Sequence, residues 1–155
     1  MKKRILLAAC VLLLCLSGCG GRHETEVWRA VSPAYMDGGP ALESESISVS
    51  GSLSELDAAV EAFNSSPSDA RLLRALPEGV AVLGWDLQGS ELRLEVSPEY
   101  ASLTGYWRTV ADCCAALTFC SVEGVGSVSI WSDETVLTAA LDPNDLMLSD
   151  LSGLE

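Results

Sequence analysis

The spacing of hydrophobic residues changes along the chain, and each spacing predicts a different element. Apolar residues alternate with charged residues over 91–96, a period of two that predicts a strand with one face in the core. Residues 80–87 precede this strand and are predicted to pair with it. The three residues between the two strands include Gly89, so the loop is short enough for a hairpin.

Two other stretches repeat their apolar residues at intervals of three and four, which is the period of a helix with one buried face. The first helix is predicted to end near Phe63, with Ser52 and Glu55 forming a capping box at its start. A shorter helical piece is predicted over 70–76. The second long helix is predicted over about 103–121. Its apolar stripe consists of Trp107, Val110, Cys114 and Leu117.

Further strands are predicted at 26–31, from Leu42 onward, at 127–131 and at 135–141. The strand from Leu42 alternates apolar and polar residues at Ile47 and Val49, which indicates an exposed or edge strand. Hairpins beside amphipathic helices predict an α+β fold. We expect a two-layer domain in which two main helices pack on one face of a mostly antiparallel sheet.

The amino terminus follows neither pattern. Three basic residues precede an unbroken apolar run over 5–16, which is long enough for a secretory signal but shorter than the roughly 20 residues that span a bilayer. The run closes on "LSGC", residues 16–19, which resembles a bacterial lipobox. The resemblance implies that Cys19 is the first mature residue and carries lipid, and two or more acyl chains hold a protein firmly. The alternative is ordinary secretion with an incidental cysteine.

The predicted organisation therefore has four parts: a lipoprotein signal peptide at 1–18, a lipidated tether at 19–26, one domain at 27–150 and a tail at 151–155. Residues 20–26 separate the lipid from the first predicted strand and reach about 25 Å at most. We therefore expect a protein anchored through lipid to the cell membrane, with its domain close to the extracytoplasmic face.

Charge excludes one class of partner. Cleavage before Cys19 removes three basic residues and no acidic ones, so nine basic residues become six against 22 acidic ones, and the formal charge falls from −13 to −16. Nucleic-acid recognition begins with neutralising phosphates, so no nucleic-acid partner is expected. Repulsion should also keep the domain from lying flat on anionic lipid.

Three of the six cysteines lie within "DCCAALTFC", residues 112–120, a density that raises the possibility of metal, disulfide or redox chemistry. On a helix, Cys120 would lie about 9 to 10.5 Å further along the axis than Cys113 and Cys114. A disulfide needs Cα atoms within about 7 Å, and a zinc site needs further Cys or His ligands. The cluster is therefore predicted to be buried core.

Other candidates for chemistry are few. His23 is the only histidine and falls in the predicted tether, so a Ser-His or Cys-His hydrolase is not expected. A weak Ca²⁺ site is one interpretation of Asp142, Asn144 and Asp145, but "DPND" is more simply a turn. A glycan-binding surface is one interpretation of the four tryptophans, but core packing is the stronger one. They are Trp28, Trp85, Trp107 and Trp131.

Two segments resemble the GerMN domain family, named after a sporulation and spore germination lipoprotein. Residues 76–100, "LPEGVAVLGWDLQGSELRLEVSPEY", contain the family's proline-glycine entry as "LPEG" and its strand end as "LEVSPEY". Residues 122–134, "VEGVGSVSIWSDE", contain the family's glycine turn into a strand as "VEGVGSVSI". The resemblance covers about 27–150 and is strongest after Leu76.

The resemblance implies an extracytoplasmic protein-interaction domain with no catalytic residue, cofactor or metal. Family members are typically lipoproteins or membrane-tethered proteins, and the namesake supports a sporulation envelope complex through a fold similar to the ring-building modules of secretion systems. This chain has room for only one such domain. We therefore expect a non-enzymatic module that binds a protein of the envelope, in sporulation, germination or general envelope function. The alternative is a binding protein for a small or cationic ligand.

Overall fold

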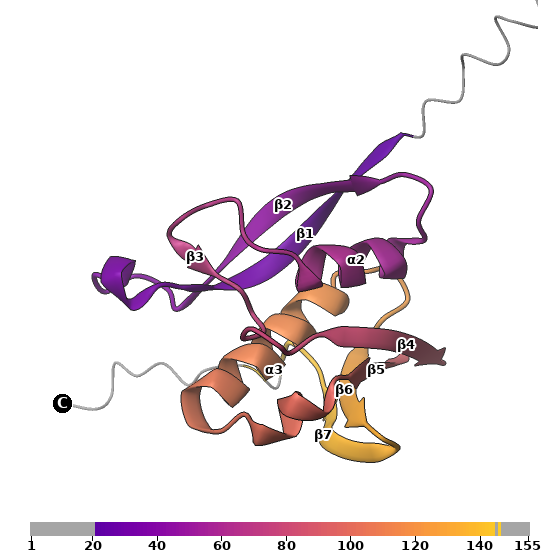
Figure 1. The fold of residues 1–155 in the computed structure, drawn as a ribbon. Helices are drawn as coiled ribbons and strands as arrows, with labels where there is room; N and C mark the ends of the chain where they lie inside the picture. The colour runs from indigo at the N-terminus through magenta and orange to yellow at the C-terminus, as the bar shows by residue number, and fades with distance from the viewer. Residues whose placement is uncertain (1–20, 145, 147–155) are drawn as a thin grey trace, which may run out of the picture.

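The computed structural model describes residues 21–144 and 146. The predicted signal peptide, Cys19 and the tail at 151–155 lie outside the described residues. The described residues form two α-helices, α2 and α3, two short 3₁₀ helices, η1 and η2, and seven strands (Figure 1). In chain order the elements are β1 (Arg22–Val31), η1 (Pro33–Tyr35), β2 (Leu42–Ser50), α2 (Glu55–Asn64), β3 (Leu72–Leu73), β4 (Val82–Gln88), β5 (Glu91–Val96), η2 (Pro98–Ser102), α3 (Gly105–Phe119), β6 (Ser127–Ser132) and β7 (Thr135–Leu141).

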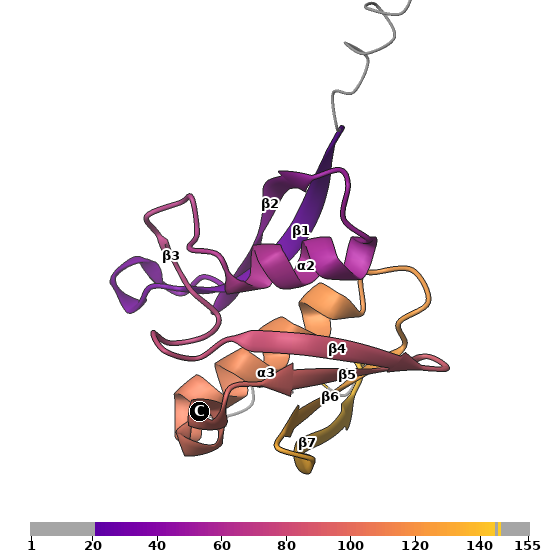
Figure 2. The ribbon, with the colours of Figure 1, turned by 45° about the vertical axis from the view of Figure 1, so that its right-hand side comes forward.

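The strands form two sheets, and both helices contact the first of them. One sheet has the order β2-β1-β3 and is antiparallel throughout. The other has the order β4-β5-β6-β7, in which only β5 and β6 run parallel, with α3 as their crossover. Both helices pack against β1, while α2 also meets β4 and α3 meets β6 (Figure 2). The predicted α+β fold, with mostly antiparallel strands and two main helices, is confirmed.

Strand β1 pairs with β2 along one edge, but only a short part of its other edge pairs with a strand. The two residues of β3 pair with Ala30 and Val31 only. Beyond them the edge meets α3, where the Trp28 backbone N–H donates to the Thr118 hydroxyl at 2.9 Å. Thr118 is fully buried. This edge of β1 therefore pairs with β3 at two residues and contacts α3 at Trp28, and strands β4 to β7 form a separate sheet.

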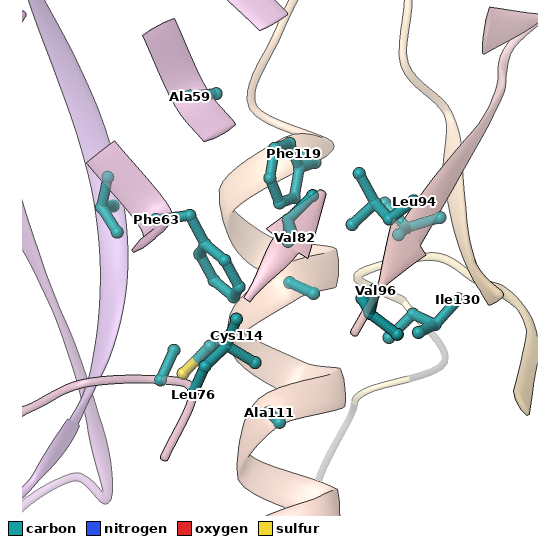
Figure 3. Packing of buried hydrophobic residues seen from close by; sticks show 14 of the residues in the cluster. Ala59, Phe63, Leu76, Val82, Leu94, Val96, Ala111, Cys114, Phe119 and Ile130 are labelled. Carbon is teal, nitrogen blue, oxygen red and sulfur yellow. The ribbon is translucent and has the colours of Figure 1, made fainter. Parts of the chain in front are cut away.

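The core lies around α3, between the helices and the inner face of the second sheet. Phe63 of α2 and Phe119 of α3 are both buried, with ring centroids 5.3 Å apart and planes inclined at 58°. Figure 3 shows side chains of both helices and of the second sheet gathered around α3. Leu92 and Leu94 of β5 and Ile130 of β6 complete this core. The alternation over 91–96 is confirmed.

Three local predictions are corrected. The first strand begins at Arg22 rather than 26, because β2 pairs with it as far as Arg22 opposite Ser50. The cap of α2 is Ser54 rather than Ser52, and its hydroxyl accepts the Asp57 N–H at 3.1 Å. The predicted helical piece at 70–76 is instead the short strand β3, since pairing with β1 outweighs helix propensity there.

A hydrogen-bond network fixes the start of α3 to its surroundings. Tyr100 follows β5, and its buried hydroxyl donates to the Asp112 carboxylate at 2.5 Å. Arg108, one turn before Asp112, pairs with that carboxylate at 3.2 Å and lies 4.9 Å from the Tyr100 ring centroid. A second Arg108 nitrogen donates to the Leu137 carbonyl and the Thr138 hydroxyl of β7, each at 2.7 Å.

This network predicts a steep loss of stability at alkaline pH. Burial, and then the negative Asp112, raise the pKa of the Tyr100 phenol well above its usual value near 10. Above about pH 10 the unfolded chain releases this proton while the folded chain keeps it, so unfolding becomes easier by about 1.4 kcal/mol per pH unit. Tyr100→Phe should remove that part of the slope in urea unfolding measured from pH 9 to 11. An unchanged slope would contradict the network.

Candidate functional site

The cysteine cluster is part of the core, as predicted. Cys113 and Cys114 are buried on α3, and Cys120 is the partly buried residue that ends the helix. All three are free thiols. Burial raises the pKa of each thiol, and that of Cys114 to about 12, so little nucleophilic thiolate is present near neutral pH. The cluster therefore offers no activated nucleophile.

His23 lies within β1, opposite Val49, and not in a tether. The earlier start of β1 places it beside a hollow that Glu24, Glu55 and Ser121 also line. The Ser121 hydroxyl donates to the Thr118 carbonyl at 2.7 Å rather than to the imidazole. Within residues 21–144 and 146, no group of three or more His, Cys, Asp or Glu side chains is arranged to hold a metal ion.

The "DPND" segment forms a turn in its described part. The Asn144 backbone N–H donates to an Asp142 carboxylate oxygen at 2.6 Å, the local bond by which aspartate favours turns. Asp145 lies outside the described residues. The turn interpretation therefore holds for Asp142 and Asn144.

The tryptophans divide into two groups, and core packing is wrong for one of them. Trp28 and Trp131 are half-buried, but Trp85 is 37% and Trp107 43% exposed. Trp107 lies in the first turn of α3, before the buried part of that helix begins. Trp85 lies opposite Leu94, on the inner face of the second sheet, but β4 is the edge strand and no other strand of the described residues covers the indole.

Trp85 joins the edge of the sheet to the amino-terminal end of α2. Its indole N–H donates to the Asp57 carboxylate at 2.9 Å. Asp57 also accepts the Ser54 hydroxyl at 2.6 Å, and these bonds, that of Ser54 above all, lower the pKa of the Asp57 carboxyl. The carboxylate is therefore held ionised at the surface beside an exposed indole.

A second hollow lies over the outer face of the same sheet. Arg93 of β5 stacks over the Trp131 ring, with its guanidinium carbon 4.8 Å from the ring centroid. Glu95 lines this hollow and accepts the Asp133 backbone N–H at 2.9 Å, which supports the tight β6–β7 turn. Acidic side chains therefore surround an aromatic ring that the protein's own arginine already covers.

No helix among the described residues is long and apolar enough to cross a membrane. The second sheet has one exposed tryptophan, Trp85 on β4, and the carboxylates of Glu95 and Glu134 lie near the half-buried Trp131 on its outer face. Neither Trp85 nor Trp107 was separable from core residues in the sequence, because both fit an apolar periodicity.

No protein-family model matches the sequence, and no curated protein matches it. Among solved structures, the first GerMN domain of the sporulation protein GerM from Bacillus subtilis superposes with a TM-score of 0.58 at 11% identity, covering 74% of this chain and 85% of that chain. This chain has the GerMN fold. The tandem GerMN domains of the same protein give a TM-score of 0.57 at 15% identity, covering 79% of this chain and 43% of that chain.

The GerMN fold confirms the resemblance drawn from residues 76–100 and 122–134. This chain spans less than half of the tandem protein and most of the single domain. At such low identity the likeness carries the fold alone. The surface residues of this GerMN-like domain must therefore be interpreted from their own geometry.

Proposed function

We propose that this chain is a lipoprotein whose GerMN-like domain binds a protein partner at the extracytoplasmic face of the cell membrane and catalyses no reaction. The observation that carries the proposal is the joining of a GerMN fold to the "LSGC" motif at 16–19. Buried thiols with raised pKa values support the non-enzymatic part. The solved structures are named as parts of a sporulation protein, so a sporulation or germination envelope complex is the first setting to test.

Cys19→Ala tests the anchor. In a bacterial host that lipidates proteins, the wild-type chain should sediment with membranes and require detergent for release. The Cys19→Ala chain should accumulate unprocessed or leave the membrane fraction, because it has no thiol to acylate. Cys15→Ala, four residues earlier in the same segment, is the matched control and should behave as wild type. Unchanged membrane association of Cys19→Ala would overturn the lipoprotein proposal.

The partner is tested by crosslinking intact cells and recovering the full chain from solubilised membranes. The interaction module is supported if a specific envelope protein crosslinks to the wild-type chain. Excess unlabelled domain should then reduce this crosslink by competition. The second candidate, a receptor for a small cation, is favoured by the carboxylates around Trp131 but opposed by Arg93 on that ring. Saturable binding of a polyamine such as spermidine, with no protein recovered, would reverse the ranking.

A further inference from the structure

Strand β2 is the outer strand of the first sheet, and the direction of its backbone groups follows from the bonds at its two ends. At one end of the β1–β2 ladder the Val31 N–H donates to the Ala41 carbonyl. At the other end the Gly51 N–H donates to the Gly21 carbonyl. An antiparallel ladder exchanges bonds at every second pair, so the odd-numbered residues of β2 bond to β1. The even-numbered residues therefore point their N–H and C=O groups away from β1.

Two of these outward-facing residues, Ser46 and Ser48, form the open part of the edge. Neither their N–H nor their C=O groups have a hydrogen-bond partner among the described residues. Helix α2 contacts β2 on the face that carries the buried Val49, whereas the side chains of Ser46 and Ser48 are exposed on the opposite face. No helix or strand lies above β2 in Figure 1. The edge at these two serines is therefore free to accept a strand.

The open part is bounded at both ends. The Ser50 carbonyl accepts the Leu53 N–H at 3.2 Å in the turn that leads to α2. Toward the start of β2, the loop after α2 reaches the strand, where the Ser68 N–H donates to the Glu45 carboxylate at 3.0 Å. An added strand thus pairs with residues 46–48, where the outward-facing serines offer both of their backbone N–H groups and both of their carbonyls.

This strand lacks the usual protection of an edge against pairing. Lysine, proline and bulges blunt natural edge strands. Strand β2 contains none of these, because its nine residues pair with β1 without a register shift. Glu43 and Glu45 are its only charged residues, and each is paired with an arginine. The edge strand β4 of the second sheet differs, because α2 is bonded along it at Val82 and Trp85.

Two exposed carboxylates on β1 indicate the charge of the strand that fits. Glu26 lies opposite Ser46 and Glu24 opposite Ser48, so these side chains share the outer face of the sheet. The Ser46 hydroxyl donates to Glu24 at 2.8 Å, but neither glutamate forms an ion pair among the described residues. A residue of an added strand opposite either serine would point to this same face, about 10 Å from β1. Serine is short, so a lysine or arginine at that position reaches across it to the carboxylate.

The inner face of β2 selects an apolar residue. Ile47 lies between the two serines and points to the opposite face, where it packs half-buried against the core. The residue of an added strand opposite Ile47 would also point to this inner face and cover its exposed part. The segment that fits is therefore extended and alternates basic with apolar residues.

A second copy of this chain suits the edge less well. Pairing of two β2 strands would bring Glu24 and Glu26 of both copies onto one continuous face, with no basic residue opposite the serines. Each chain also has a formal charge of −13, so two copies repel each other, whereas a basic segment is attracted. Charge therefore favours a basic partner.

We propose that the open edge of β2 at residues 46–48 binds an extended, basic segment of a protein partner, which adds a strand to the first sheet. The proposal rests on the domain being a protein-interaction module, as proposed above, and specifies how that module recognises its partner. Backbone hydrogen bonds supply the affinity, and the side chains of Glu24, Glu26 and Ile47 supply the selection.

The test uses amide hydrogen exchange measured by NMR on the full chain in detergent micelles. In the free chain the amides of Ser46 and Ser48 should exchange much faster than those of Ile47 and Val49, which bond to β1. The probe is a capped octapeptide of alternating lysine and valine. At about ten times its Kd it should slow the two fast amides about tenfold, because about nine-tenths of the sites are then occupied. A lack of saturable binding, or protection at other amides instead, would overturn the proposal.

Two variants of Ser48 test the backbone. Ser48→Pro removes an outward N–H at a position where an edge strand tolerates proline, and should weaken binding of the lysine peptide at least about tenfold. Protected amides at Glu45 and Ile47 in the free Ser48→Pro chain would show that the ladder with β1 is intact. Ser48→Ala keeps the N–H and should bind within a few-fold of wild type. Equal binding by the two variants would overturn the proposal.

A second pair of variants tests the charge and leaves the edge strand unchanged. Glu24→Gln combined with Glu26→Gln should weaken binding of the lysine peptide about fivefold. The matched control combines Glu78→Gln with Glu99→Gln, which removes the same charge from exposed positions outside the first sheet and should bind within about twofold of wild type. Equal weakening in both double variants would overturn the site, because the peptide would then respond to net charge alone. Edge protection that rises with protein concentration without peptide would also overturn it, by assigning the edge to a second copy.

The failure of this inference is distinguishable from failure of the proposed function. A crosslinked envelope partner that Ser48→Pro recovers as well as wild type does would overturn the edge site and leave the interaction module standing. Peptide protection at Ser46 and Ser48 without any recovered envelope partner would support the edge site and count against the module.

Discussion

Arg29→Gln is expected to lower the free energy of unfolding by about 3–5 kcal/mol, because it breaks a buried ion pair on one side only. Arg29 is fully buried in β1, and its Nε donates to Glu45 of β2 at 2.9 Å. Its remaining nitrogens donate to the carbonyls of Ala62 and Phe63 at 2.9 and 3.1 Å. The variant leaves Glu45 buried without its cation and the end of α2 without its donors.

Urea unfolding followed by circular dichroism measures this loss. The matched control is Arg71→Gln, which removes an ion pair with Asp69 from a side chain that is 50% exposed and should cost far less than Arg29→Gln. Adding Glu45→Gln to Arg29→Gln should recover part of the loss, since the orphaned charge is then gone. A loss for Arg29→Gln no larger than that for Arg71→Gln would show that the buried pair is not what holds α2 to the first sheet.

Phe119→Ala is expected to cost about 3–5 kcal/mol, because a fully buried ring leaves a cavity that the surrounding core only partly fills. The ring packs on Phe63, so its removal loosens the contact between α2 and α3. Asn64 follows Phe63 at the end of α2, and its carboxamide bonds to the N–H and C=O of Val82 at the start of β4. The loss should therefore extend beyond the two helices.

The control for Phe119→Ala is Tyr106→Ala, also on α3 but 47% exposed, which should cost less than about 1 kcal/mol. A double-mutant cycle with Phe63→Leu should show coupling of about 0.5–1.5 kcal/mol between the two rings. Hydrogen exchange should report faster opening at Val82 in Phe119→Ala. Exchange at Val82 that matches wild type would show that the Asn64 bonds are independent of the helix contact.

Elements whose signal is local were predictable from the sequence. The alternation over 91–96 and the loop at Gly89 predict β4, β5 and their hairpin, and Gly89 indeed adopts a φ of 66° in a two-residue turn. Helical periodicity predicts the ends of α2 and α3 to within about two residues of where the structure places them. The likeness to GerMN was carried by these same segments, and the fold confirms it.

Pairings between distant segments were not predictable. Leu72 and Leu73 favour a helix locally, and only the edge of β1 at Ala30 and Val31 makes them a strand. The bond from the Trp28 N–H to the Thr118 hydroxyl was also hidden, because the two residues are 90 positions apart in the sequence. The exposure of Trp85 was equally hidden, because it follows from strand order rather than from spacing. Nothing in "EVWRAV" marks Arg29 as buried, since its partners lie on β2 and α2.

The early start of β1 has a mechanical consequence. With Cys19 lipidated as proposed, only Gly20 and Gly21 separate the lipid from a strand that is paired from its first residue, and two residues span at most about 7 Å. The β1–β2 ribbon then takes the place of a flexible linker between the lipid and the domain. It would restrict how far the domain can rotate or tilt relative to the bilayer.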